Sequence, residues 1–280
     1  MNAKAVILVT GGYANNNDIL EEKGYDSDGL DVFGMPGHNG DGILMALAAG
    51  GKSWLNNSSL MEYPMNPKIG RKSNVISRMP NSLWVNGNGT RFVDENCSAK
   101  VPARAALAVR TQDVSYAVFD QAILDAAKSA SEDVASVVEQ GVSDGYIFKA
   151  DSIKDLAAAV DMDASALAAT LETYNGYCAA GSDEEFGKDP AMLQAIGQAP
   201  FYLSENSGIY FLTTIGGIDT TESCEVRAEE GGVIKGLYAM DVDGVELYKG
   251  LYTIDIPGSC NANNIYTGRI AAQKACELLA

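Results

Sequence analysis

The chain has 280 residues and is strongly acidic, with 37 Asp and Glu residues against 20 Lys and Arg residues and a formal net charge of −17. This charge excludes a nucleic-acid-binding protein, because phosphates are bound by a cationic face. The composition, with 46% hydrophobic and 20% charged residues, is that of a globular protein and excludes disorder of the whole chain.

The first predicted element is a strand over 4–10, an apolar, β-branched run that ends at Gly11-Gly12 and is typical of a buried, central parallel strand. A Gly-rich loop over 34–42 then leads into an alanine-rich helix over 43–49. Such a junction directs backbone N–H groups and the positive end of a helix dipole to one spot, where a phosphate, a carboxylate or a ring edge can bind.

The middle of the chain has the pattern of an α+β segment. A hairpin is predicted over 83–93 around an Asn-Gly turn, and helices are predicted over 101–110, 119–130 and 152–162. The last of these begins with a capping box at Ser152. Asp163 is predicted to cap a further helix, whose inward face carries Leu167, Leu171 and Tyr174.

Strands return after Pro200, where they are predicted over 209–214, 224–227 and 236–240. A final helix is predicted to begin near Ser259 and to run to Leu279, and its inward side chains are expected to be Ile265, Ile270, Ala271, Ala275 and Leu278. Two Gly-rich segments of strands and helices therefore flank the α+β segment.

Histidine and cysteine limit the chemistry further. His38 is the single histidine, so His-based zinc sites and Ser-His-Asp or Cys-His catalysis would all have to use it. We expect it to be a hydrogen-bonding loop residue, and we expect no metal. The five cysteines form no Cys-x-x-Cys pair and are predicted to be reduced packing residues.

No apolar run approaches the roughly 18 residues that span a bilayer, and no secretory signal begins the chain. We therefore expect no membrane segment and a cytoplasmic location for this chain.

Four segments carry a family pattern. The strand ends in Thr10-Gly11-Gly12-Tyr13, and the loop before the first helix reads Gly40-Asp41-Gly42-Ile43. Further along, 85–95 follows the pattern Val-Asn-x-x-Gly-x-Arg-Phe-x-x-Glu, and 174–187 contains Tyr-Asn and then Gly-x-Asp-x-x-Phe-Gly. In this order and spacing, the segments resemble those of the FAD-dependent flavoproteins of the fumarate reductase and succinate dehydrogenase type.

The resemblance implies an α/β FAD-binding domain made from residues 1–52 and 203–280, interrupted by an inserted α+β substrate-capping domain over 53–202. It also implies an oxidoreductase that transfers a hydride between flavin and an unsaturated small molecule, with the active site between the two domains. The sequence identifies no electron donor.

The resemblance also implies which residues bind FAD, namely Thr10, Gly11, Gly12, Gly40, Asp41, Gly42, Asp241, Pro257, Gly258, Ser259 and Asn261. For the glycines the alternative is turn geometry that requires a positive φ, and for Asp41 it is a helix cap. The N-terminus of the final helix is expected to point its dipole at the flavin pyrimidine.

The chain departs from the family in several places. No Gly-x-Gly-x-x-Gly fingerprint occurs in it, so the FAD-binding domain is expected to be incomplete. Leu212-Thr213 stands where the fumarate reductases have a His, and 253–258 stands where they have Asn-Arg-Leu-Gly-Gly. A substrate other than fumarate is therefore expected.

Three residues are candidate catalysts. Lys100 and Arg104 lie near the position of the family's proton-donating Arg, and Tyr252 has a hydroxyl that could bind or protonate a substrate. The alternatives are solvated surface charges for the two cations and a packing role for the tyrosine. A second hypothesis for the whole chain is a non-catalytic flavoprotein fragment or the partner-binding half of a split enzyme, in which a second chain or a preceding segment completes the FAD site.

Overall fold

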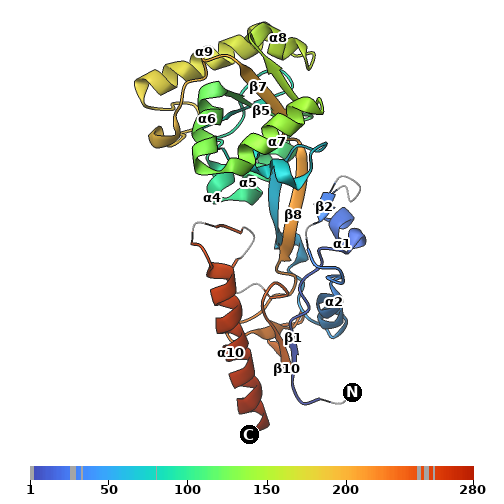
Figure 1. Ribbon diagram of the computed structural model, residues 1–280. Helices are drawn as coiled ribbons and strands as arrows, with labels where there is room; N and C mark the ends of the chain where they lie inside the picture. The colour runs from blue at the N-terminus through green and yellow to red at the C-terminus, as the bar shows by residue number, and fades with distance from the viewer. Residues whose placement is uncertain are drawn as a thin grey trace. The chain divides into compact units, whose positions relative to one another are not determined.

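The computed structural model describes residues 3–25, 30–32, 34–79, 81–244, 247–248, 252–254 and 256–280. It consists of two compact units (Figure 1): unit 1 comprises Met1–Glu62 with Phe211–Ala280, and unit 2 comprises Tyr63–Tyr210. Both divisions fall inside strands, β3 (Ser59–Met65) and β8 (Gly208–Ile215). The predicted domain boundaries, 52/53 and 202/203, lie ten and eight residues earlier in the chain.

The first sheet of unit 1 is formed by three strands in the order β1-β10-β9. β1 (Val6–Leu8) is parallel to β10 (Val233–Ala239), which is antiparallel to β9 (Glu225–Arg227). The predicted parallel strand is therefore confirmed, but its predicted central position is wrong. β1 lies at the edge of this sheet, and Val6, Ile7 and Val9 are 43%, 37% and 51% exposed. These apolar side chains are typical of a strand that is buried between neighbours. In the described part of the chain, no further strand pairs with the free edge of β1.

A second sheet contains β2 (Leu30–Val32), β8 and β3 in the order β2-β8-β3. Unit 1 also contains the helices α1 (Asn17–Glu22), α2 (Asp41–Ala48) and α10 (Ser259–Leu279) and the short 3-10 helix η2 (Leu55–Asn57). Apolar side chains from β1, α1, α2 and β8 form its main core, with Leu8, Tyr13, Leu20, Ile43, Leu60 and Phe211 among them. The helix predicted over 43–49 is thus confirmed, with its start two residues earlier.

The final helix, α10, packs Ala271 and Ala275 against Tyr238 and Met240 of unit 1. The predicted inward face is confirmed for these two alanines. It is wrong for Ile265, which is 69% exposed. Ile265 lies six residues before Ala271, and at about 100° per residue the two side chains point roughly 120° apart around the helix. None of the helices in the described residues is long and apolar enough to cross a membrane.

Unit 2 contains an antiparallel sheet with the order β4-β5-β7-β6. Its strands are β4 (Leu83–Asn86), β5 (Ser115–Asp120), β6 (Ile147–Ala150) and β7 (Phe201–Glu205). The predicted hairpin over 83–93 is only partly present, since the return segment contributes a single bridge between Val85 and Arg91. β4 pairs over four residues with β5 instead, because β5 is buried throughout and gives a longer ladder.

The helices of unit 2 follow local signals closely. Ser152 accepts a hydrogen bond from the backbone N–H of Asp155, and Asp163 accepts from Ser165 and Ala166, so both predicted N-caps are confirmed. The helix predicted from 119 begins at Gln121, because the two preceding residues complete β5. The helices are α3 (Asn74–Ser77), α4 (Cys97–Lys100), α5 (Pro102–Arg110), α6 (Gln121–Ala130), α7 (Glu132–Ser143), α8 (Ile153–Ala158) and α9 (Ala164–Ala180), with 3-10 turns η3 (Arg71–Ser73) and η4 (Pro190–Met192).

A buried ion cluster joins the two family motifs of unit 2. Arg91 donates to Glu95 at 2.9 and 3.0 Å and to Asp183 at 3.0 and 2.9 Å. Lys188 lies 3.1 Å from Glu95 and also donates to the carbonyl of Ser82 and the hydroxyl of Tyr174. Two cations thus face two carboxylates in the interior, with their hydrogen bonds satisfied. The cluster explains why Arg, Glu and Asp occur in these motifs without assigning them any chemistry.

Asp183 begins a run of three acidic residues, 183–185, but its own side chain is buried. It is 7% exposed, and it accepts hydrogen bonds from the backbone N–H groups of Glu185, Phe186 and Lys188 as well as from Arg91. The acidic run in the sequence indicates solvent exposure, but this carboxylate turns inward because Arg91 neutralises it there.

The Asp183 carboxylate should make the free energy of unfolding decrease at low pH. Burial raises its pKa, but the hydrogen bonds from Arg91 and the backbone outweigh burial and lower it to about 2. The folded pKa is below the unfolded value, so its contribution of about 2 kcal/mol is present above pH 4 and is lost as the pH falls toward 2. Urea unfolding of wild type and Asp183→Asn at several pH values should show a stability difference that shrinks over this window. A difference that is constant from pH 6 to pH 2 would contradict this expectation.

Candidate functional site

The loop that follows β1 is held by a buried carboxylate from the other end of the sequence. Asp243 is fully buried and accepts hydrogen bonds from the backbone N–H groups of Thr10 and Gly12 and from the hydroxyl of Thr10. The next backbone N–H, that of Tyr13, donates to the hydroxyl of Thr214 at 2.9 Å. The loop between residues 10 and 13 therefore has a fixed shape that the side chains of distant residues impose.

The second predicted loop, at the start of α2, lies against the first. The backbone N–H of Gly40 donates to the carbonyl of Gly12 at 2.9 Å, and that of Gly42 donates to the hydroxyl of Thr10 at 3.1 Å. Two groups of residues that the sequence assigned separately to a cofactor site are therefore neighbours in unit 1.

The glycines of these two loops are required by close packing of protein atoms. A methyl group on Gly12 would lie 2.2 Å from the hydroxyl of Thr214, and one on Gly42 would lie 2.5 Å from that of Thr10. Gly11, Gly12 and Gly40 also have φ values of 87°, 78° and 79°, which favour glycine. The turn-geometry alternative therefore accounts for these three.

The cap alternative for Asp41 is wrong. The N-cap of α2 is Gly40, which adopts the left-handed conformation, and Asp41 is the first helical residue, with an exposed side chain and no capping hydrogen bond. The left-handed turn required here excludes most side chains at the cap position, so the carboxylate falls into the first turn, where it faces the positive end of the helix dipole.

Asp241 connects these loops to the last helix. Burial and the nearby Asp243 raise its pKa, while hydrogen bonds from the Val242 backbone and the Asn264 side chain, together with the charge of His38, lower it. The charge of Asp241 also raises the pKa of Cys260, the second residue of α10, in addition to burial. Asp241 is thus close to the loop before α2 on one side and to the first turns of α10 on the other.

The N-terminus of α10 provides unfilled hydrogen-bonding capacity. Its N-cap, Gly258, has a φ of 80°. Within the described part of the chain, Gly258 makes no side-chain cap bond and has no neighbouring atom within 4 Å of the place where a methyl group would lie. Pro257 and Asn261 are exposed beside it, and Ser259 is hydrogen-bonded to the hydroxyl of Tyr248. A helix of 21 residues whose first N–H groups lack a side-chain cap is suited to a polar or anionic group of a ligand.

The candidate catalysts belong to different units, Tyr252 to unit 1 and the two cations to unit 2. Tyr252 is 8% exposed and stacks edge-on with Tyr248, 4.7 Å between ring centroids, in a small core of unit 1. This burial agrees with the packing role given above as the alternative for Tyr252. Arg104 is an exposed residue of α5 in unit 2. Lys100 ends α4, but its side chain lies outside what the structure describes.

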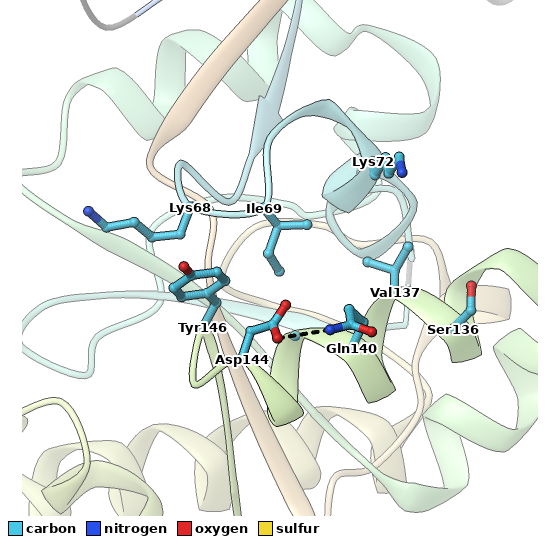
Figure 2. Close-up of a pocket in the computed structure, with 9 residues that line it drawn as sticks. Lys68, Ile69, Lys72, Ser136, Val137, Gln140, Asp144 and Tyr146 are labelled. Carbon is cyan, nitrogen blue, oxygen red and sulfur yellow. Dashed lines mark hydrogen bonds between the residues drawn. The ribbon is translucent and has the colours of Figure 1, made fainter.

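Unit 2 contains a hollow of about 410 Å³ (Figure 2). It is bounded by the turn that carries Lys68 and Lys72 and by α7, where Gln140 donates to Asp144 at 2.8 Å. None of the residues predicted from the sequence lines it, and its polar side chains are exposed. We assign no chemistry to it. The described residues also contain no group of three or more His, Cys, Asp or Glu side chains that could hold a metal ion.

Three residues of the site were missed by the sequence analysis or given a smaller role. Asp243 and Thr214 hold the first loop, and the imidazole of His38 fills the space in front of Gly11. The sequence signal for Asp243 is the pair of acidic residues, Asp241 and Asp243, that follows β10.

Comparison with known proteins identifies the family. Residues 1–240 match the family model described as an FAD binding domain. The chain belongs to this family. Its sequence is 30% identical over 99% of the chain to a vinyl phenol reductase of Lactiplantibacillus plantarum, and 28% identical over 99% to a cytochrome-type fumarate reductase of Shewanella frigidimarina. The predicted resemblance to fumarate reductase-type flavoproteins is thereby confirmed.

The likeness extends to a solved structure. A 3-ketosteroid Δ1-dehydrogenase from Sterolibacterium denitrificans superposes with a TM-score of 0.74 at 19% identity and covers 98% of this chain, a likeness that shows the fold. The predicted α/β FAD-binding fold class is confirmed. The chain spans 61% of the vinyl phenol reductase, 46% of the fumarate reductase and 53% of the dehydrogenase chain.

Family membership identifies FAD as the cofactor, and unit 1 fits such a group. The N-terminus of α10 lacks a side-chain cap, the space before Gly258 is open, and Oδ1 of Asp241 is buried without a hydrogen-bond partner among the described residues. These are donors and an acceptor of the kinds that the polar atoms of FAD can satisfy.

Proposed function

We propose that unit 1 holds the flavin part of FAD and that the chain belongs to a reductase of an unsaturated small molecule other than fumarate. The observation that carries this proposal is the convergence of the 10–12 loop, the 40–42 loop, Asp241 and the α10 N-terminus within unit 1 of a chain that matches an FAD-binding family. Bound FAD supplies hydride transfer.

The residues of this site would bind and orient the cofactor. The positive end of the α10 dipole, at its N-terminus, would stabilise negative charge on the cofactor, and Asp241 would accept from a cofactor hydroxyl or N–H. Asp243 would act indirectly, by fixing the backbone of the 10–12 loop.

A dicarboxylate substrate is disfavoured by the way this chain uses its cations. Arg91 and Lys188 are buried, and Glu95 and Asp183 neutralise them. The family's His is replaced by Leu212-Thr213. A substrate with less negative charge than fumarate therefore fits this chain better, because two carboxylates need a cationic clamp.

The vinyl phenol reductase relative supports an alkene conjugated to a phenol ring as the substrate class. We further propose that unit 2 is the substrate-capping domain and that Lys100, Arg104 and Tyr252 are the residues to test for proton transfer. The buried ring of Tyr252 makes a positioning role through Tyr248 the alternative for that residue.

Two measurements test the proposal. Protein loaded with excess FAD and then desalted should keep a flavin absorbance band, and it should oxidise reduced methyl viologen faster with 4-vinylphenol than with fumarate. Arg104→Ala, an exposed change, is expected to slow this reaction without lowering the melting temperature. A colourless protein would count against the flavin site, and a preference for fumarate would count against the substrate class.

In a second candidate function, the chain is one part of a flavoprotein and binds another polypeptide segment. The exposed edge of β1 favours this function. Val6, Ile7 and Val9 are aliphatic, neighbouring in sequence and exposed. A second chain or a preceding segment with the dinucleotide-binding fingerprint would cover them and complete the FAD site. Size-exclusion chromatography with light scattering tests this idea, since a monodisperse monomer that binds FAD tightly would contradict it.

We also propose a cytoplasmic location for this chain. All five cysteines are free, which suits a reducing compartment. Fractionation of cells that express the protein, followed by immunodetection, tests the location, and recovery from a membrane or extracellular fraction would contradict it.

A further inference from the structure

The single histidine of the chain lies in the flavin site proposed above. His38 belongs to the loop before α2, and its ring lies so close to Gly11 that a methyl group there would be 2.5 Å from Nε2 and 2.7 Å from Cδ2. The backbone carbonyl of His38 accepts from the N–H of Asn15. The loop is therefore anchored, and the imidazole has a defined place against the backbone of the 10–12 loop.

Two buried polar atoms in this region lack partners in the part of the chain that the structure describes. They are Nδ1 of His38 and Oδ1 of Asp241. A buried nitrogen or oxygen without a hydrogen bond is costly, so native proteins rarely leave one without a water or ligand partner. Two such atoms from different segments, linked by the electrostatic influence of His38 on Asp241, indicate a shared polar space.

Asp241 also has an unusual backbone. Its φ is 58°, in the left-handed region that residues other than glycine seldom adopt. Such conformations persist where the surroundings enforce them, and they concentrate at ligand sites. The Asn264 side chain donates a hydrogen bond to the Asp241 carboxylate from the α10 side, whereas Oδ1 has no partner among the described residues.

We propose that His38 is a cofactor-binding residue and that its Nδ1 makes a hydrogen bond to a polar atom of bound FAD. This assignment rests on the flavin site proposed above. The contact of the ring with Gly11 positions the imidazole, and Nδ1, which has no partner among the described residues, is the ring nitrogen left for the cofactor. The requirement for glycine at position 11 then follows from the ring, because any side chain there would displace it.

A pair of amide variants separates the two ring nitrogens. The amide nitrogen of Asn reaches the position of Nδ1, whereas that of Gln reaches the position of Nε2. FAD binding to wild type, His38→Asn and His38→Gln is measured by flavin fluorescence titration, and the melting temperature of each protein is measured without FAD. We expect His38→Asn to bind within threefold of wild type and His38→Gln to bind about tenfold more weakly, which corresponds to one lost hydrogen bond. The melting temperatures of the cofactor-free proteins should agree, because Nδ1 has no partner among the residues that the structure describes.

Each other outcome overturns the assignment. Wild-type affinity in His38→Gln would show that Nδ1 makes no bond to FAD. An equal loss in both variants, with or without a lower melting temperature, would assign His38 a role other than that of an Nδ1 donor or acceptor. If wild type itself fails to bind FAD, the proposed flavin site fails together with this assignment, whereas normal wild-type binding with normal variants removes the assignment alone.

Discussion

Replacing Asp243 with Ala should abolish retention of FAD. The carboxylate accepts three hydrogen bonds, from two backbone N–H groups and one hydroxyl of the 10–12 loop, and it is fully buried. Its removal leaves these donors without an acceptor, and each unsatisfied buried donor costs about 1–3 kcal/mol. We expect the loop to change conformation, because water or a different backbone path must then satisfy the donors.

Asp120 provides a matched control for this variant. It is also a buried aspartate, and it accepts from the backbone N–H groups of Ile123, Gly197 and Gln198, but it lies in unit 2. Asp120→Ala should lower the melting temperature by a similar amount and leave flavin retention intact at 10 °C, where the protein is folded. Absorbance after desalting distinguishes the two variants. Equal flavin content in Asp243→Ala and wild type would show that the 10–12 loop does not support the cofactor.

Replacing Arg91 with Met should destabilise the protein by about 3–5 kcal/mol, the cost of removing one partner from a buried charge cluster. Arg91 makes four hydrogen bonds to Glu95 and Asp183, and its guanidinium lies over the rings of Tyr174 and Phe186. Without it, Lys188 alone faces two carboxylates. Arg91→Lys should recover only part of the loss, since a single ammonium cannot make both bidentate pairs.

A double variant tests whether the loss comes from uncompensated charge. In Arg91→Met with Asp183→Asn, the pair formed by Glu95 and Lys188 remains and the cluster is neutral again. We therefore expect the double variant to lose less free energy of unfolding than the sum of the losses in the two single variants. Urea unfolding measures these free energies. Lys274→Ala, which removes an exposed pair with Glu277, serves as the surface control and should leave stability nearly unchanged. Additive losses would show that the two residues act independently.

Local signals in the sequence were sufficient for much of the helical structure. Asp163 caps α9 through the N–H groups two and three residues later, and Leu167, Leu171 and Tyr174 recur at helical spacing, so every interaction that defines this helix lies within a few residues. The ordered motifs likewise identified the family and its cofactor, because the residues that a ligand or a tight turn requires stay at fixed spacing along the chain.

Strand partners and burial depended on the rest of the chain. The sequence of β1 indicates an apolar strand but cannot show that it lies at the edge of its sheet. The Asn-Gly turn after β4 indicates a hairpin, yet β5 offers a longer ladder and forms the main pairing. In both cases the strand that pairs is far away in the sequence. A local pattern of residues therefore cannot predict the pairing.

The sequence by itself determined the acidic surface, the capped helices and the membership of an FAD-binding family, since composition, spacing and motif order are properties of the chain alone. The tertiary structure decided which side chains build the site. Asp243 holds Thr10 across 233 residues, and Asp183 turns inward to Arg91 across 92. A carboxylate is buried only where the fold places such a donor beside it. Burial of the carboxylate without this partner would cost more free energy than leaving it at the surface.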